Sequence, residues 1–331
     1  MDGRREDRAI DPGRIERVAV IGAGLMGHGI AQVFAQHGCS VMLYDVGEDL
    51  LKNALERIRS NLKLYVEAGV EDEGVFETVL SRIKTTTKLP DAVARAQFVT
   101  EAVPENLDLK MEVFQEIDAA TDKNVIMASN TSTLSITRIG ESIKKSDRLL
   151  MTHWFNPPHL IPVVEVVKGE STSEEAFTST FRFLKEMGKE PVHVLKQVPG
   201  LLVNRIQTAM FREIVGLLQA GVAHAEDIDK AVRGSFGIRL AAVGPLTTVD
   251  LAGVDLWYLG SKHLYPLFDD SKEPQKVLHD MVAAGSHGVK TGKGFFEYGP
   301  GRAAGIIKDR DITLIKMLDL LYDKEKEGDK A

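Results

Sequence analysis

A histidine and a glutamate on either side of a proline-containing turn are the first residues in this chain that suggest chemistry. His153-Trp154-Phe155-Asn156-Pro157-Pro158 precedes the apolar run Val163–Val167, which contains Glu165. The prolines favour a turn between two extended stretches, and a hairpin centred on His159 places His153 opposite Glu165. An imidazole whose other nitrogen is held by a carboxylate is an effective general base near neutral pH. The pair therefore predicts a general base at the edge of a sheet.

A second candidate site is a glycine-rich loop near the N-terminus. The apolar residues Val18–Ile21 run directly into Gly22-Ala23-Gly24-Leu25-Met26-Gly27, and a helical stretch follows. The first glycine permits a tight turn out of the strand, the second lets a pyrophosphate approach the backbone, and the third lets the helix lie against the sheet. The helix N-terminus offers free N–H donors to the phosphates. The predicted contacts to a dinucleotide in this loop are Gly22, Gly24, Leu25, Met26 and Gly27.

An acidic residue at the end of the next strand indicates which dinucleotide is bound. The run Ser40–Asp45 is a second apolar strand that ends on Asp45. The Asp45 carboxylate can accept hydrogen bonds from the 2′-hydroxyl of an adenosine ribose, and it repels a 2′-phosphate. A strand, a glycine loop, a helix and an acidic strand end together are a specific signal. We therefore predict NAD as the cofactor in preference to NADP; a glycine-rich turn without a ligand is the alternative.

Composition and charge count against several other classes of function. The chain has 331 residues, of which 44% are hydrophobic and 27% charged, and its net charge is −7. This charge gives no general attraction to nucleic acid or to anionic membranes, and no apolar run approaches the roughly 20 residues that span a bilayer. The sequence has no Cys/His cluster with the spacing of metal ligands, so no metal is predicted. The single cysteine, Cys39, fits a reducing compartment, and we expect a cytoplasmic protein.

The order of apolar patterns predicts two domains after a polar tail. Residues 1–15 are predicted to be a disordered tail, and residues 16–197 alternate strands with helices. That alternation is typical of an α/β domain with a Rossmann-type, doubly wound, mostly parallel sheet. Residues 200–298 are predicted to form a smaller all-α domain, and residues 299–331 a C-terminal extension. Further strands are expected at Arg82–Thr86, Phe98–Val103, Val125–Ser129, Leu149–Phe155, Val163–Val167 and Val192–Leu195, and helices at 49–66, Leu107–Ala120, Ile136–Ser142, Glu174–Met187, Leu201–Ala220, Ala225–Val232, Val254–Leu267, Pro274–Ala284 and Ile312–Leu321.

Several further motifs follow one another in a fixed order along the chain. They are the extension of the glycine loop through His28-Gly29-Ile30-Ala31-Gln32, then Glu101-Ala102-Val103-Pro104-Glu105-Asn106-Leu107, Ser129-Asn130-Thr131-Ser132, Pro199-Gly200-Leu201-Leu202-Val203-Asn204-Arg205 and Lys290-Thr291-Gly292-Lys293-Gly294-Phe295-Phe296. Together with the histidine turn, they make the chain resemble the 3-hydroxyacyl-CoA dehydrogenase family over roughly residues 16–298. The resemblance implies NAD-dependent oxidation of the secondary alcohol of a 3-hydroxyacyl-CoA to the 3-ketoacyl-CoA, in fatty acid metabolism.

The resemblance also implies a role for each matched polar residue. It makes His153 the general base and Glu165 its orienting partner. For Asn204, the alternative is a helix-start residue that bonds only to backbone. The family forms a twofold dimer through its second domain, so a homodimer is expected; otherwise the apolar helices simply cover the α/β domain. The other matched residues are Ser132 and Asn204, which hold the substrate oxygen, and Glu105, Lys110 and Asn156, which contact the ribose and nicotinamide side of the cofactor.

Two departures from the family pattern leave the substrate open. Typical members have a lysine that binds the nucleotide of coenzyme A near the end of the helix after the second strand, and here that position is Ala68. A second position, often lysine in bacterial relatives, is Val70, and Lys63 is the candidate substitute. The segment Phe236–Pro245 replaces a shorter turn and contains Arg239, which can pair with a free substrate carboxylate or form an ordinary salt bridge. The motifs favour a CoA ester. The alternatives are a dehydrogenase of a free hydroxy carboxylate (gulonate, carnitine-like or pyridine carboxylate) and a non-catalytic NAD-binding structural protein.

Overall fold

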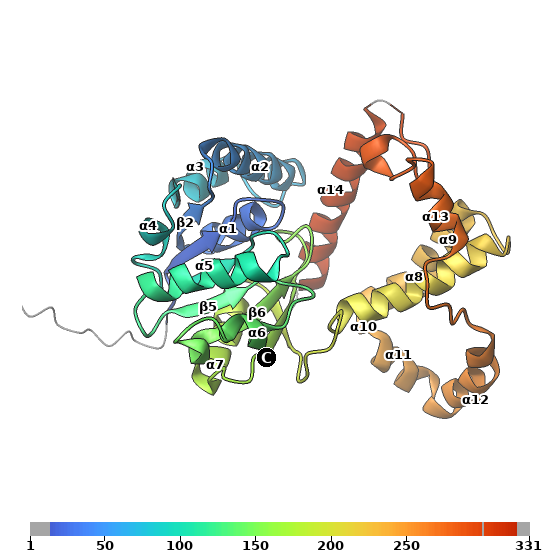
Figure 1. Cartoon of the computed structure of the whole chain (residues 1–331). Helices are drawn as coiled ribbons and strands as arrows, with labels where there is room; N and C mark the ends of the chain where they lie inside the picture. Colours follow the sequence, from blue (N-terminus) through green and yellow to red (C-terminus); the bar gives the residue numbers. More distant parts are fainter. Residues whose placement is uncertain (1–13, 300, 323–331) are drawn as a thin grey trace, which may run out of the picture. The chain divides into compact units, whose positions relative to one another are not determined.

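The computed structural model describes residues 14–299 and 301–322 (Figure 1). Nearly all of the tail predicted at residues 1–15, and the charged end of the chain after residue 322, lie outside the described residues. The chain divides into two compact units. Among the described residues, the first unit runs to Leu202 and also takes in Asp311–Leu318, and the second comprises Val203–Arg310 and Asp319–Tyr322. The predicted boundaries near residues 197–200 and 298–299 stay a proposal.

The first unit is built on one eight-stranded sheet with the order β3-β2-β1-β4-β5-β6-β7-β8. Neighbouring strands run parallel, with β6 and β7 as the antiparallel pair of the described sheet. The predicted Rossmann-type, mostly parallel fold is therefore confirmed. The strands are β1 Arg17–Ile21, β2 Ser40–Tyr44, β3 Ile83–Thr86, β4 Phe98–Glu101, β5 Ile126–Ser129, β6 Leu149–Trp154, β7 Val163–Lys168 and β8 Glu190–His193.

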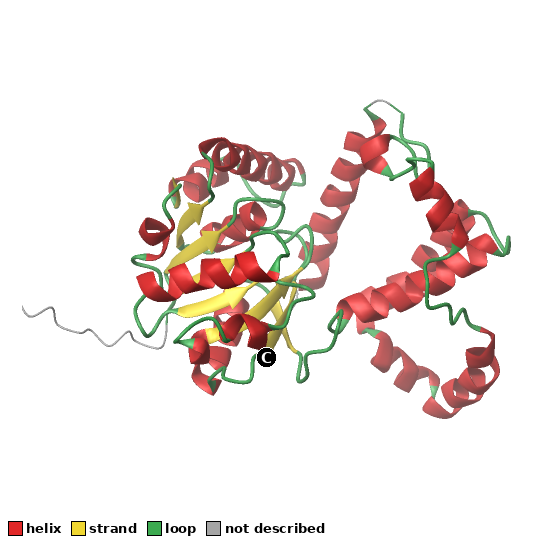
Figure 2. Ribbon diagram, viewed as in Figure 1, coloured by secondary structure: helices red, strands yellow, loops and turns green. Residues whose placement is uncertain are grey.

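Helices cover both faces of this sheet (Figure 2). Because successive side chains of a strand point to opposite faces, Val18 and Val20 of β1 join one hydrophobic core while Ala19 and Ile21 join the other. The first core is covered by α1 Gly27–Gln36, α2 Glu48–Glu67, α3 Gly74–Ser81 and α7 Glu174–Glu186, and the second by α4 Leu89–Val93, α5 Leu107–Ala120 and α6 Ile136–Gly140.

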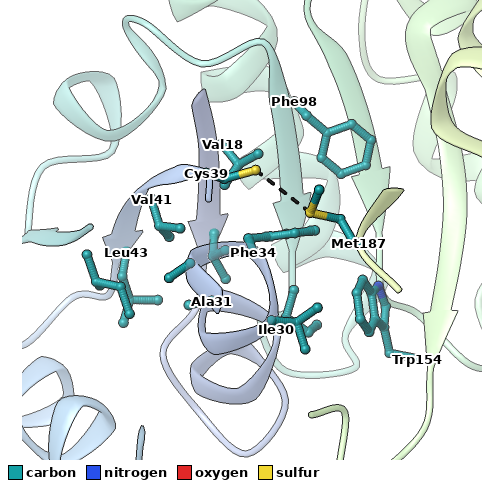
Figure 3. Packing of buried hydrophobic residues seen from close by; sticks show 14 of the residues in the cluster. Val18, Ile30, Ala31, Phe34, Cys39, Val41, Leu43, Phe98, Trp154 and Met187 are labelled. Carbon is teal, nitrogen blue, oxygen red and sulfur yellow. Dashed lines mark hydrogen bonds between the residues drawn. The ribbon is translucent and has the colours of Figure 1, made fainter. Parts of the chain in front are cut away.

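Aromatic rings and two sulfur atoms fill the centre of the first core (Figure 3). The ring of Phe34 on α1 lies 6.2 Å from that of Phe98 and 5.7 Å from that of Trp154, measured between centroids. The thiol of Cys39 donates to the sulfur of Met187 at 3.8 Å. Burial raises the pKa of the Cys39 thiol to about 11.

The second unit is helical, as its sequence pattern predicts. Its helices are α8 Val203–Gln219, α9 Ala225–Val232, a π-helical turn Arg233–Gly237, α10 Ile238–Val243, α11 Pro245–Ala252, α12 Val254–Leu264 and α13 Lys276–Ala283. The last helix, α14 Arg302–Tyr322, is longer than the predicted Ile312–Leu321. Among the described residues, no helix combines the length and apolarity needed to cross a membrane.

Strand β4 and helix α6 each end two residues before their predicted ends, and three further elements of the first unit differ from the sequence prediction. Strand β8 begins at Glu190 and not at Val192, because Glu190 pairs with Val163 at the start of β7. Helices α3 and α4 were not predicted, since each is a short helix between longer elements. Within α3, Val75 and Val79 form the buried stripe that stabilises it.

Candidate active site

His153 and Glu165 face each other across the antiparallel pair β6–β7, as the hairpin predicts. Nδ1 of His153 lies 2.7 Å from Oε2 of Glu165, and both side chains are buried. Because a carboxylate only accepts, the Nδ1 proton points to Glu165 and Nε2 keeps its lone pair. The second oxygen of Glu165, Oε1, accepts from the backbone N–H of Leu202 at 2.9 Å. The imidazole is therefore held in the tautomer that a general base requires.

The loop that follows β5 is gathered around one carboxylate oxygen. Oε1 of Glu105 accepts from the hydroxyl of Thr131 at 2.6 Å, from the backbone N–H of Ser132 at 3.0 Å, and from the N–H and hydroxyl of Thr133, both at 2.9 Å. Burial alone would raise the pKa of Glu105, but these hydrogen bonds lower it to about 2. Glu105 therefore stays ionised and fixes the backbone of Ser132.

A buried ion pair between Lys110 and Glu101 lies next to Glu105. Nζ of Lys110 donates to Oε1 of Glu101 at 2.6 Å and to the carbonyl oxygen of Val103 at 3.2 Å, and it lies 3.5 Å from Oε2 of Glu105. The other oxygen of Glu101 accepts from the hydroxyl of Ser129 at 2.6 Å. Burial raises the pKa of Glu101, and the Lys110 ammonium opposes this. The network ties the end of β4 to the end of β5, where the Ser132 loop begins.

The glycine loop and Asp45 have the geometry that a dinucleotide requires. Gly22 has φ of +102°, and a Cβ on Gly27 would lie 1.7 Å from the Gly22 carbonyl oxygen, so both positions require glycine. No atom lies within 4 Å of a Cβ built on Gly24, which leaves its backbone open to a phosphate. Asp45 accepts from the N–H groups of Ala23 and Val46, each at 2.7 Å. These residues fit NAD.

Two further polar contacts shape the loop and the hairpin. His28 bonds through Nδ1 to the carbonyl oxygen of Gly24 at 2.7 Å, and burial lowers the pKa of this imidazole. Oδ1 of Asn130 accepts from the backbone N–H of Trp154 at 2.9 Å, which fixes the end of β6 against the loop after β5. Asn156, a predicted cofactor contact, is exposed at the start of the turn after β6.

The structure places the predicted site residues in two groups. His153, Glu165, Ser132, Glu105 and the glycine loop belong to the first unit, at the carboxyl ends of the parallel strands where such sheets bind ligands. Lys110, which is buried, and Lys63, which is exposed on α2 and lies 4.0 Å from Glu67, also belong to the first unit. The second group is Asn204 and Arg239, on α8 and α10 of the second unit.

Sequence reasoning missed several polar residues of this edge. The missed residue with the clearest signal is Glu101, a charged residue that ends a buried strand of otherwise uncharged residues. Thr131 and Thr133 gave no separate signal, because their hydroxyls matter only through their position around Glu105. Within the described ranges, no three His, Cys, Asp or Glu side chains are grouped as metal ligands would be.

Comparison with protein families decides which fold family this geometry belongs to. The model of the 3-hydroxyacyl-CoA dehydrogenase NAD-binding domain matches residues 17–198, and that of the C-terminal domain of the same family matches residues 200–298. The chain belongs to the 3-hydroxyacyl-CoA dehydrogenase family. Members of this family are NAD-dependent oxidoreductases, and the predicted cofactor is thereby confirmed.

Relatives within the 3-hydroxyacyl-CoA dehydrogenase family act on two kinds of substrate. The chain is 33% identical to 5-formyl-3-hydroxy-2-methylpyridine 4-carboxylate 5-dehydrogenase of Mesorhizobium japonicum, over 94% of this chain and 100% of the relative. It is 36% identical to 3-hydroxybutyryl-CoA dehydrogenase of Clostridioides difficile, over 85% of this chain and 99% of the relative. A crystal structure of the pyridine carboxylate enzyme, described as an NAD⁺-dependent dismutase, superposes with a TM-score of 0.85 at 32% identity, covering 93% of this chain and 99% of the other. That of (S)-3-hydroxybutyryl-CoA dehydrogenase from Ralstonia eutropha gives 0.70 at 34% identity, covering 86% and 100%.

Proposed function

We propose that this protein catalyses the reversible NAD-dependent oxidation of a secondary alcohol, with a 3-hydroxyacyl-CoA as the first candidate substrate. The observation that carries the proposal is the buried bond from His153 Nδ1 to Glu165 at 2.7 Å, at the same sheet edge as the glycine loop. A paired imidazole of this kind supports general base chemistry, and the family motifs favour the CoA ester.

Each polar residue of the first unit has a part in this proposal. Nε2 of His153 takes the hydroxyl proton, and Glu165 stabilises the imidazolium that forms. Ser132, held by Glu105, donates to the substrate oxygen. The glycine loop and Asp45 would hold NAD, which would supply the hydride acceptor. We also retain Asn204 as a donor to the substrate oxygen, and Asn156 and Lys110 on the cofactor side, as proposals from the family resemblance.

A free hydroxy carboxylate is the second candidate substrate, and three observations favour it. Ala68, the residue directly after α2, stands where a lysine is typical, and the nearby Lys63 lies 4.0 Å from the carboxylate of Glu67. Arg239 is exposed and has no ion-pair partner among the described residues, so it is available to a carboxylate. The solved structure of the pyridine carboxylate enzyme superposes on this chain with a TM-score of 0.85, and that of the R. eutropha CoA enzyme with 0.70.

The substrate is tested by comparing kcat/KM for 3-hydroxybutyryl-CoA with that for free hydroxy carboxylates, in wild type and Arg239→Ala. Fast turnover of the thioester, unaffected by Arg239→Ala, supports the CoA ester. Failure on all acyl chain lengths, with turnover of a free acid that falls in Arg239→Ala, supports the second candidate. No NADH formation from either panel would leave the third possibility, a non-catalytic NAD-binding protein.

The base is tested by His153→Gln, which removes the proton acceptor and keeps a side chain of similar size. We expect kcat to fall by roughly 10²- to 10⁴-fold, the usual contribution of a positioned acid–base group, while the affinity for NADH measured by fluorescence is unchanged. His193→Gln, an exposed histidine at the end of β8, is the matched control. Turnover within about tenfold of wild type in His153→Gln would exclude this role.

We also propose a homodimer formed through the second unit. Many large apolar side chains of this unit are exposed, and a groove of about 310 Å³ is lined by Leu256, Trp257, Leu264, Tyr265 and Phe268. Light scattering at micromolar concentration should give about twice the chain mass of 36.4 kDa; a mass near that of one chain would contradict the dimer. The cytoplasmic location and a role in fatty acid metabolism stay predictions.

A further inference from the structure

Lys189 is a buried lysine just before β8 whose ammonium has no carboxylate beside it. Its side chain is 6% exposed, and it forms no ion pair in the described part of the chain. Nζ donates instead to the carbonyl oxygens of Pro158 at 2.7 Å and Ile161 at 3.0 Å, and it lies 5.4 Å from the centre of the Trp154 ring. Every partner of this ammonium is therefore in β6 or in the turn between β6 and β7.

The turn needs donors from outside because its own backbone supplies few. Its two tandem prolines have no N–H, and the N–H groups of Leu160 and Ile161 both bond to the carbonyl oxygen of Pro157. The carbonyls of Pro158 and Ile161 are thus left for Lys189. The carbonyl of His159 between them accepts from the hydroxyl of Tyr65 on α2 at 2.7 Å.

The position of the ammonium also constrains the residue next to the base. Trp154 follows His153 directly and belongs to the first core, where its ring lies against Phe34 (Figure 3). An ammonium over an aromatic face is attracted to it. Lys189 therefore contacts the chain on both sides of Asn156, once at Trp154 and again at Pro158.

Burying this charge is unfavourable, so packing alone does not explain a lysine here. Transfer of an ammonium from water without a counter-ion costs more than transfer of an apolar chain of the same length. Burial lowers the pKa of Lys189 to about 7, which is the sign of that cost. A methionine would fill the same space without it. What a methionine could not supply is the two hydrogen bonds that the ammonium donates to two carbonyl oxygens of the turn.

We propose that Lys189 is a positioning residue for the reaction: it fixes the turn between the base His153 and its partner Glu165, and with it Asn156. The proposal rests on the function proposed above, in which His153 is the base and Asn156 contacts the cofactor. Lys189 touches neither reactant. It acts through the register and spacing of the hairpin, which set the 2.7 Å bond between Nδ1 and Glu165.

The test compares Lys189→Met with Lys189→Gln, which keeps an N–H donor, and with Lys185→Met as control. Lys185 also places an ammonium near an aromatic ring, 5.7 Å from the centre of Phe181, but it is exposed on α7. Four quantities are measured in each variant: kcat, KM for NAD, the dissociation constant of NADH, and the downfield NMR signal of the His153 Nδ1 proton. Thermal unfolding shows which variants are folded.

In folded Lys189→Met we expect kcat/KM to fall by about 10²-fold, as small misplacements of a reacting group do, with a shifted or broadened Nδ1 signal and weaker NADH binding. Lys189→Gln should lose less of the kcat/KM and of the affinity for NADH, and shift the Nδ1 signal less, than Lys189→Met. Lys185→Met should match wild type. If Lys189→Met does not fold, Lys189→Gln against wild type carries the comparison. A lower melting temperature with kcat/KM, NADH binding and the Nδ1 signal unchanged would overturn the proposal.

The proposed function fails separately from this inference. If the wild type forms no NADH from any substrate, the reaction assigned above is wrong. The Nδ1 signal and the dissociation constant of NADH are measured without turnover, so they still show whether Lys189 positions His153 and the cofactor side of the turn.

Discussion

The Asp45 carboxylate accepts two backbone hydrogen bonds and still has lone pairs for a ribose hydroxyl. The same two bonds hold its negative charge next to the glycine loop, where the 2′-phosphate of NADP would be repelled. We expect kcat/KM for NAD to exceed that for NADP by at least about tenfold, or about 1.4 kcal/mol. Asp45→Ser should narrow the ratio, and Asp49→Ser, in the exposed first turn of α2, should not. Equal use of the two cofactors by the wild type would contradict this assignment.

Single residues were predictable from the sequence where a local pattern fixes their partners. His153 and Glu165 were paired correctly because a slip of one residue would turn a side chain of β6 or β7 to the other face. The hydrogen bond from the Ser132 N–H to Glu105 was not predictable, because it joins the loop after β4 to the loop after β5. Lys189 lies in a polar stretch that is typical of a surface turn, and only the packing of β8 against the hairpin buries it.

At the scale of elements, the loop after β5 depends on the ionisation of Glu105. Hydrogen bonds lower the pKa of this carboxyl from 4.5 to about 2, so it stabilises the fold above pH 4.5, and this contribution is lost as the pH falls toward 2. Glu105→Gln should therefore unfold more easily than wild type at pH 7, with a difference that shrinks as the pH falls from about 4.5 to about 2.

Urea-induced unfolding at a series of pH values measures this difference. Glu112→Gln, an exposed glutamate on α5, is the control and should show no such dependence. A difference between wild type and Glu105→Gln that is the same at pH 3 and pH 7 would mean that the ionisation of Glu105 does not contribute to stability.

Long periodic elements were the best predicted, and short ones the worst. The predicted α5 Leu107–Ala120 agrees with the structure at both ends, and the helix predicted at 49–66 is α2 Glu48–Glu67, one residue longer at each end. The position of β8 was wrong, because the apolar residues after Pro191 suggest a later strand while pairing with β7 begins at Glu190. The register of β8 is set by its pairing with β7 and not by the alternation of apolar and polar residues within β8.

At the scale of the whole molecule, the C-terminal helix joins the first unit through its middle. Asp311–Leu318 belongs to that unit, and Ile315 is 2% exposed there. Ile315→Ala should reduce the free energy of unfolding by about 2–5 kcal/mol, the range for large-to-small changes in a core. Met317→Ala, on the exposed side of the same segment, should change it by less than about 0.5 kcal/mol. Equal, small effects in both variants would show that the segment is not part of the core.

The rate at which the Cys39 thiol reacts with a labelling reagent reports how often the core of the first unit opens. The chain has one cysteine, so any thiol label reports on this position alone. Only the thiolate reacts, and with a pKa of about 11 it is present at on the order of one part in a thousand at pH 8, on a residue that is 3% exposed. Alkylation must therefore wait for α1 and the strand after it to separate from Met187. We expect saturating NADH to slow the labelling, because it binds the closed form; labelling as fast as a free peptide thiol would mean that this core opens continually.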